Sequence, residues 1–192
     1  MLNKNFFIKL KKEYQESDIE RRKIISQSNV ILHNSKRVIF ALHRGNIKEA
    51  EESLEQIKNE LVKMQKKFGF NRLSDEGSYK AGVEEFVEAA MFHKYIKGKK
   101  VDKIDKVKIK FDSYLGGICD LTGEMVRYAV NKASKKEFDE VEKTKEAIND
   151  IIGQLADFDM TGYLRTKYDQ AKGNLRKIEQ MNYEISIRRI EK

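Results

Sequence analysis

The sequence predicts an all-α protein that folds as one antiparallel helical bundle. The chain of 192 residues contains no proline and 11 glycines, so few residues interrupt a helix. Apolar residues recur at alternating spacings of three and four, the period of one helix face, and no segment alternates apolar and polar residues for long enough to predict a strand. The connections are short and no repeat or linker divides the chain, so residues 1–192 are predicted to form a single domain.

The first part of the chain is predicted to form two helices in succession. A short amphipathic helix is expected over residues 3–15. Ser17 and Glu20 have the spacing of a capping box, in which a hydroxyl and a carboxylate satisfy free N–H groups at the start of a helix. The second helix is therefore expected to begin there and to end at His43, just before a glycine.

The next part of the chain carries a clear helical pattern. A third helix is expected over residues 47–68, where the apolar positions follow the three-four spacing of a single seam: Ile47, Ala50, Leu54, Ile57, Leu61, Met64 and Phe68. Turn-forming residues at 69–77 predict a break. A fourth helix is expected over residues 79–97 and ends at a glycine.

Three further helices complete the predicted bundle of seven. The fifth is expected over residues 102–133, because the same spacing continues through Ile104, Val107, Phe111, Tyr114, Ile118, Leu121, Met125 and Tyr128. The sixth is expected over residues 135–154 and the seventh over residues 160–191.

The composition indicates which class of partner the protein binds and in which compartment it is found. Lys and Arg number 39 against 31 Asp and Glu, and the formal net charge of +8 favours a polyanionic partner. The single cysteine, Cys119, excludes an intramolecular disulfide framework and is expected to be a buried, inert thiol of a reducing cytoplasm. No signal peptide and no membrane-spanning run is found, so a cytoplasmic protein without membrane contact is predicted.

Two pairs of acidic residues do not fit a solvated helix face. Glu85 and Glu88 lie about 60° apart on a helix that is apolar nearly all round, so their carboxylates are predicted to be buried or to line a cavity. Asp120 and Glu124 lie at i and i+4 on the face of the fifth helix that is opposite its apolar seam. Glu84 points about 100° away from Glu85 and is expected off the acidic face.

Three glycines share the face of the fifth helix that carries the second acidic pair: Gly116, Gly117 and Gly123. Each glycine inside a helix costs about 1 kcal/mol relative to alanine. A close neighbour or a ligand is therefore expected to offset this cost.

The acidic pairs predict a site for a hard divalent cation, Mg²⁺ or Mn²⁺, with four ligands: Glu85, Glu88, Asp120 and Glu124. Ordinary ion pairs with Arg127 or Lys80 are an alternative. A di-iron centre is disfavoured, because neither pair is followed by a histidine at i+3. The histidines are scattered and are expected at the surface or at helix ends: His33, His43 and His93.

Lysines are concentrated between residues 94 and 110, a segment that contains eight lysines and only two aspartates. Such a surplus suits a polyanion that binds by counterion release. An ordinary solvated face explains it equally well. The lysines predicted to contact nucleic acid are Lys80, Lys97, Lys99, Lys100 and Lys103.

Several long motifs resemble the translin and translin-associated factor X family. GVEEFVEA at 82–89 and YLGGICDLTGEMVR at 114–127 are similar to the factor X branch. LRTKYD at 164–169, KIE at 177–179 and YEISIR at 183–188 are similar to translin itself. The resemblance covers most of the chain and fits a single member that serves both roles.

This resemblance implies a seven-helix subunit that assembles into a hollow homo-oligomer, most simply an octamer, and binds single-stranded RNA or DNA. In the factor X branch the corresponding acids form a Mg²⁺-dependent endoribonuclease site, so the resemblance implies that Glu85, Glu88, Asp120 and Glu124 hold the metal and are catalytic. The ion would activate a water and neutralise charge on the scissile phosphate. The basic stretch of translin before the fourth helix is reduced here to Lys80.

Two other functions remain open at this stage. The first is a non-catalytic scaffold that binds single-stranded RNA or DNA, as translin alone does. The second is a purely structural helical oligomer. Cleavage of RNA that depends on Mg²⁺ would separate the expected endoribonuclease from both.

Overall fold

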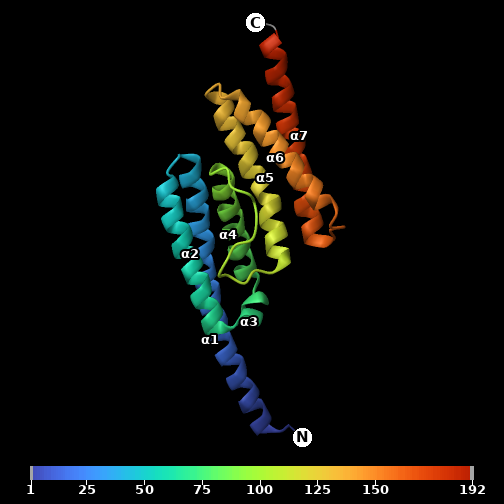
Figure 1. Ribbon diagram of the computed structural model, residues 1–192. Coiled ribbons are helices and arrows are strands. Elements are labelled where there is room, and N and C mark those ends of the chain that lie inside the picture. Colours follow the sequence, from blue (N-terminus) through green and yellow to red (C-terminus); the bar gives the residue numbers. More distant parts are fainter. Residues whose placement is uncertain (1, 191–192) are drawn as a thin grey trace.

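The computed structural model describes residues 2–190, and within them the only regular structure is helical (Figure 1). The seven helices are α1 (Lys4–His43), α2 (Ile47–Phe68), α3 (Phe70–Ser74), α4 (Gly77–Ile96), α5 (Phe111–Ser134), α6 (Phe138–Ala156) and α7 (Gly162–Ile190). The all-α class is confirmed, and the total of seven helices agrees with the prediction because α3 was not predicted while the first two predicted helices are one. The predicted end of the seventh helix at Glu191 lies outside the described residues. No helix within residues 2–190 combines the length and the apolar content needed to cross a bilayer.

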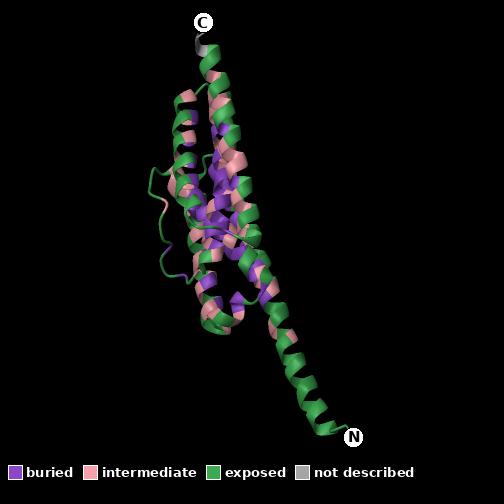
Figure 2. Ribbon diagram, turned by 90° about the vertical axis from the view of Figure 1, so that its right-hand side faces the viewer, coloured by how far each residue is buried: buried purple, intermediate pink, exposed green. Residues whose placement is uncertain are grey.

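Two groups of helices pack against each other to form an elongated bundle. α1, α2 and α4 pack together on one side, and α5, α6 and α7 pack together on the other (Figure 1). The contact between α4 and α5 joins the two groups, and fully buried residues from both sides line it and the neighbouring interfaces: Ile24, Leu61, Phe86, Leu121 and Ile178. Figure 2 shows this buried centre, with an exposed N-terminal part of α1 extending beyond it.

The N-terminal region contains one helix of 40 residues where two were predicted. The helix is capped by Asn3, whose side chain accepts a hydrogen bond from the backbone N–H of Phe6 at 3.2 Å. Ser17 and Glu20 lie inside this helix, so the predicted capping box is wrong. The reason is that no glycine or proline separates residues 4 and 43, and a capping motif alone does not end a helix.

The fifth helix begins at Phe111, later than predicted. Residues 97–110, here called the lysine strap, are irregular, and both Gly98 and Lys106 have positive φ angles, of 63° and 72°. Ile104 and Val107 have the spacing of a helix that continues into α5, but they are not helical. Their side chains are buried and hold the strap against the bundle. The predicted break at 69–77 likewise contains a short helix, α3.

Candidate functional site

The four predicted acids come together where α4 packs against α5. Glu85 and Glu88 lie one turn apart on α4, and Asp120 and Glu124 lie one turn apart on α5. The charges of the other three acids all raise the pKa of Glu88, so the four form one electrostatic group, here called the carboxylate cluster. The helical spacing therefore placed these side chains correctly relative to one another.

Glu88 is the most buried member of the cluster. Its side chain lies among apolar residues of α4, and only 8% of the residue is exposed. Burial, followed by the negative charges of Glu85, Asp120 and Glu124, raises the pKa of Glu88 to about 9. Without a bound cation, Glu88 is therefore protonated at neutral pH.

The other three acids each face a cation of the protein. Lys36 of α1 lies 3.9 Å from Glu85, and Lys167 of α7 pairs with Asp120. Burial raises the pKa of Glu85, against the charge of Lys36, and burial also raises the pKa of Asp120, against its hydrogen bond from Lys167. These pairs partly offset the mutual repulsion of the cluster.

Glu124 is held by a histidine that was expected at the surface. The side chain of His43 is only 4% exposed, and its Nε2 contacts Glu124. Its Nδ1 is buried without a hydrogen-bond partner, and the ring lies against Phe92 with centroids 4.8 Å apart. Although burial alone would raise the pKa of Glu124, the hydrogen bond with His43 and the charge of Arg127 lower it. His43 does lie at a helix end, as the last residue of α1, but the prediction that it lies at the surface is wrong.

Glu84 also belongs to the site, although its helical position suggested otherwise. Lys167 Nζ lies 2.8 Å from Glu84 Oε1 and also pairs with Asp120, so the lysine bridges α4 and α5. The hydroxyl of Tyr163 donates a second hydrogen bond to the same oxygen of Glu84, at 2.6 Å. A sequence signal for this contact existed, because Gly116 and Gly117 leave room on α5 for Glu84 and Val87 of α4.

The donor set suits a hard cation, but the side chains do not converge on one point. Within residues 2–190 no group of three or more His, Cys, Asp and Glu side chains has an arrangement that would hold a metal ion. Asp120 turns to Lys167 and Glu124 turns to His43 instead. Cys119 adds no ligand, because burial, and then the charge of Asp120, raise the pKa of its thiol to about 12.

The predicted nucleic-acid-binding lysines lie on another surface. Four of them, Lys97, Lys99, Lys100 and Lys103, are exposed on the lysine strap, and Lys97 Nζ also lies 2.9 Å from Glu51. Lys80 is exposed near the other end of the strap, where it lines a shallow recess with Lys108 and Lys110.

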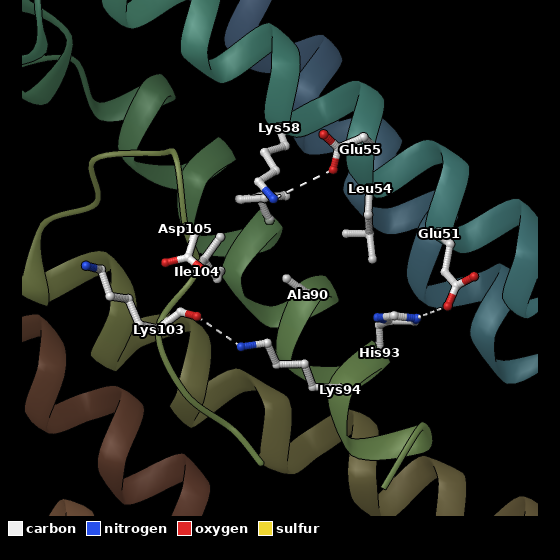
Figure 3. A pocket seen from close by; sticks show the side chains of 11 residues that line it. Glu51, Leu54, Glu55, Lys58, Ala90, His93, Lys94, Lys103, Ile104 and Asp105 are labelled. Atoms are coloured by element: carbon white, nitrogen blue, oxygen red, sulfur yellow. Dashed lines mark hydrogen bonds and ion pairs between the residues drawn. The ribbon is translucent and has the colours of Figure 1, made fainter. Parts of the chain in front are cut away.

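The strap and the carboxylate cluster lie on opposite faces of α4. The strap covers the face that carries Ala90, His93 and Lys94, and together they line a cavity of about 350 Å³ (Figure 3). At 100° per residue, this face points about 180° away from Glu84, Glu85 and Glu88. The predicted lysines of the strap and the predicted acids of one subunit therefore do not form one site.

Comparison with known proteins relates this fold and these motifs to one family. The translin-associated protein X homologue of Schizosaccharomyces pombe is 24% identical over 212 residues, which cover 97% of this chain and 89% of the relative. The crystal structure of AfC3PO superposes with a TM-score of 0.84 at 24% identity, covering 96% of this chain and 98% of the other. An AfC3PO–duplex RNA complex superposes with a TM-score of 0.80 at 23% identity, covering 98% of each chain.

At these identities the structural likeness concerns the fold. The family follows from the sequence, because the Translin family model matches residues 19–189, which include α4, α5, the lysine strap and nearly all of α7. This chain therefore belongs to the Translin family.

Proposed function

We propose that this chain binds RNA as a subunit of a homo-oligomer. Membership of the Translin family supports the proposal, as does the likeness of its fold to AfC3PO, whose structure was determined in complex with duplex RNA. The observation that carries it is the lysine strap. Seven lysines are exposed along this one segment: Lys97, Lys99, Lys100, Lys103, Lys106, Lys108 and Lys110.

The strap is a fixed surface and not a loose tail. The side chain of Gln65 on α2 bonds to both the backbone N–H and the C=O of Lys108, at 3.1 and 2.7 Å. The hydroxyl of Tyr114 on α5 accepts a hydrogen bond from the backbone N–H of Ile104 at 2.7 Å. The lysines are thereby held as a row of positive charges, which favours phosphate binding through the release of condensed counterions.

An oligomer accounts for the exposed N-terminal part of α1. This part extends beyond the bundle (Figure 2) and exposes large apolar side chains: Phe6, Phe7, Ile8, Leu10, Tyr14 and Ile19. A patch of this kind is a typical protein–protein contact. We propose that a second copy of the chain covers it within a hollow octamer of translin type, and light scattering at micromolar concentration should give the octamer mass. A monomer mass would contradict this assembly.

RNA binding is tested by fluorescence anisotropy with a labelled single-stranded RNA in EDTA. The variant replaces the four predicted strap lysines together by alanine: Lys97, Lys99, Lys100 and Lys103. It should bind RNA more weakly, and the slope of log affinity against log salt should fall by about 0.7 for each phosphate that is no longer neutralised. The control replaces four exposed lysines outside the strap: Lys48, Lys66, Lys135 and Lys143. Equal losses of affinity in the two variants would mean that the strap acts only through the overall charge of the protein. Absence of RNA binding by the parent would contradict the proposed function.

Metal-dependent cleavage of RNA is a second candidate, favoured by one specific observation. Glu88 is buried among three other carboxyls, an arrangement that costs free energy unless a cation or a proton neutralises it. The ligands would be Glu85, Glu88, Asp120 and Glu124. A divalent cation bound there would supply positive charge for the scissile phosphate and its attacking water.

Two of the four ligands are already held by other residues of the protein. Lys167 holds Asp120 from the side of α7, and His43 holds Glu124 from the side of α1. Each contact fixes the orientation of one carboxylate, and a bound cation would have to draw an oxygen of each carboxylate toward Glu85 and Glu88. Purified protein should cleave a labelled single-stranded RNA with Mg²⁺ and not with EDTA, and Mg²⁺ or Mn²⁺ alone should raise its melting temperature. Binding without cleavage would leave the RNA-binding scaffold as the function.

A further inference from the structure

Four exposed residues surround the carboxylate cluster. Lys36 and Arg127 are cations with side chains that are 53% and 46% exposed. Phe40 and Tyr163 are aromatic residues that are 49% and 61% exposed. These four residues, here called the rim, come from α1, α5 and α7, and none of them is in the lysine strap.

The α1 side of the rim combines both cations with one ring. Lys36 Nζ lies 3.9 Å from Glu85 Oε2, and Phe40 lies one helical turn further along α1. The guanidinium of Arg127 lies 5.1 Å from the centroid of the Phe40 ring and 3.5 Å from Glu124. Arg127 has five N–H donors, so this contact leaves donors available for a phosphate.

The α7 side of the rim is formed by Tyr163. Its hydroxyl is bonded to Glu84 at 2.6 Å, which fixes the ring beside the cluster, and Lys167 Nζ lies 5.3 Å from the ring centroid. The cluster therefore has an exposed aromatic ring on the side of α1 and another on the side of α7.

We propose that the rim holds a single-stranded RNA segment across the carboxylate cluster, with phosphates at Lys36 and Arg127 and bases stacked on Phe40 and Tyr163. The inference rests on the proposed RNA binding. A cluster of carboxylates repels a polyanion, so cations must lie beside it, and the lysine strap is on the opposite face of α4. Aromatic rings stack on unpaired bases of any sequence, which makes the expected ligand single-stranded.

The test measures the affinity of the full-length protein for two labelled RNAs in EDTA, one single-stranded and one a blunt duplex. Phe40→Leu and Tyr163→Leu should each weaken single-strand binding about tenfold and leave duplex binding unchanged, because only unpaired bases stack. Lys36→Gln with Arg127→Gln should lower the slope of log affinity against log salt for single-stranded RNA by about 1.4.

Two controls separate stacking from other roles. Tyr163→Phe keeps the ring but loses the bond to Glu84 that fixes it, so its affinity for single-stranded RNA should lie between those of the parent and Tyr163→Leu. Tyr183→Leu removes an exposed ring elsewhere on α7 and should have no effect. Parental affinity in the Phe40 and Tyr163 leucine variants, or equal losses for both RNAs, would overturn the inference. A change of oligomer mass in those variants would overturn it too, since the rim would then be a subunit contact. Absence of RNA binding by the parent would instead contradict the proposed function.

Discussion

Glu84 on α4 lies against the bare backbone of Gly116 on α5, so closely that a Cβ added at Gly116 would be 2.1 Å from Glu84 Oε2. At the next glycine, a Cβ would be 2.8 Å from both the backbone oxygen of Glu84 and the Cβ of Val87. The two glycines thus let α4 and α5 approach each other at the carboxylate cluster. This contact is the close neighbour that offsets their cost inside a helix.

Gly117→Ala should destabilise the protein more than Gly116→Ala. At Gly117 the added methyl meets backbone and a β-branched side chain, and overpacking of this kind costs about 1–3 kcal/mol, which exceeds the roughly 1 kcal/mol gained in helix propensity. At Gly116 the methyl meets the end of a flexible side chain, which can rotate away at the expense of its bond to Lys167. Urea denaturation of both variants measures the difference.

Gly153→Ala is the matched control for the two glycine variants. Gly153 lies in α6, and nothing lies within 4 Å of a Cβ built there. Alanine should therefore raise the free energy of unfolding by about 0.5–1 kcal/mol through helix propensity alone. A stabilised Gly117→Ala variant would show that α4 and α5 do not depend on this close approach.

Lys167→Met should destabilise the protein by about 2 kcal/mol, between the cost of breaking an exposed ion pair and that of breaking a fully buried one, because it leaves half-buried Glu84 and Asp120 facing each other without their shared cation. Adding Glu84→Gln to this variant should recover part of the loss, since one of the two facing charges is removed. Lys172→Met is the control, because its exposed pair with Asp169 should contribute less than about 1 kcal/mol. Equal losses in the two lysine variants would contradict the bridging role of Lys167.

Much of the fold follows from the period of the apolar residues, and the errors have physical causes. α2 matches its prediction because seven apolar residues keep one seam between two breaks. The spacing of Ile104 and Val107 predicted a helical start for α5 that is wrong, because an irregular strap also buries two apolar residues three positions apart. Periodicity records which residues are buried, and it does not record whether the chain between them is helical.

The acids of the site were more predictable than their partners. Glu85, Glu88, Asp120 and Glu124 share faces of two helices, and helical geometry is enough to relate them. Lys167 and His43 reach the cluster from α7 and α1, which are distant in sequence, so their contacts depend on how the helices pack. Glu84 was misplaced because a helix between two neighbours has more than one buried face, and Glu84 lies on the side of α7.

Stability without divalent metal should fall as the pH rises from about 5 to 9, and Glu88→Gln should remove much of this fall. The pKa of Glu88 is raised from 4.5 to about 9 in the folded state, by burial and then by Glu85, Asp120 and Glu124, while Lys167 opposes the rise. Between these values the folded protein keeps a proton that the unfolded chain has lost, so stability is present at low pH and is lost by up to about 1.4 kcal/mol per pH unit.

Melting temperatures in EDTA across this pH range test the linkage. The curves of parent and Glu88→Gln should converge at low pH, where both side chains are neutral, and diverge as the pH rises, with the variant more stable. Glu16→Gln removes an exposed carboxylate that pairs with Lys12 and should keep the parental slope. Parallel curves for the parent and Glu88→Gln would mean that Glu88 titrates normally.

Glu88→Gln and Asp120→Asn should both abolish RNA cleavage that depends on Mg²⁺, because each removes a negative charge from the donor set while keeping the size of the side chain. They should differ in stability. Burial and the other three acids disfavour the charge of Glu88, so its amide should keep or raise the melting temperature in EDTA at neutral pH. Asp120→Asn also removes a charge that burial disfavours, but it weakens the pair with Lys167, so it should raise the melting temperature less than Glu88→Gln does or leave it unchanged.

RNA binding and metal binding, measured on the same two variants, separate a catalytic cluster from a structural one. Both variants should bind single-stranded RNA in EDTA as tightly as the parent, or more tightly, since removing a carboxylate near the RNA reduces repulsion of phosphates. Both should also lose the rise in melting temperature that Mg²⁺ gives the parent. If cleavage persists at the parental rate in both, the four acids are not the site of the reaction. If cleavage, RNA binding and melting temperature all fall together, the cluster acts by holding α4 to α5, and the loss of cleavage is a loss of the fold.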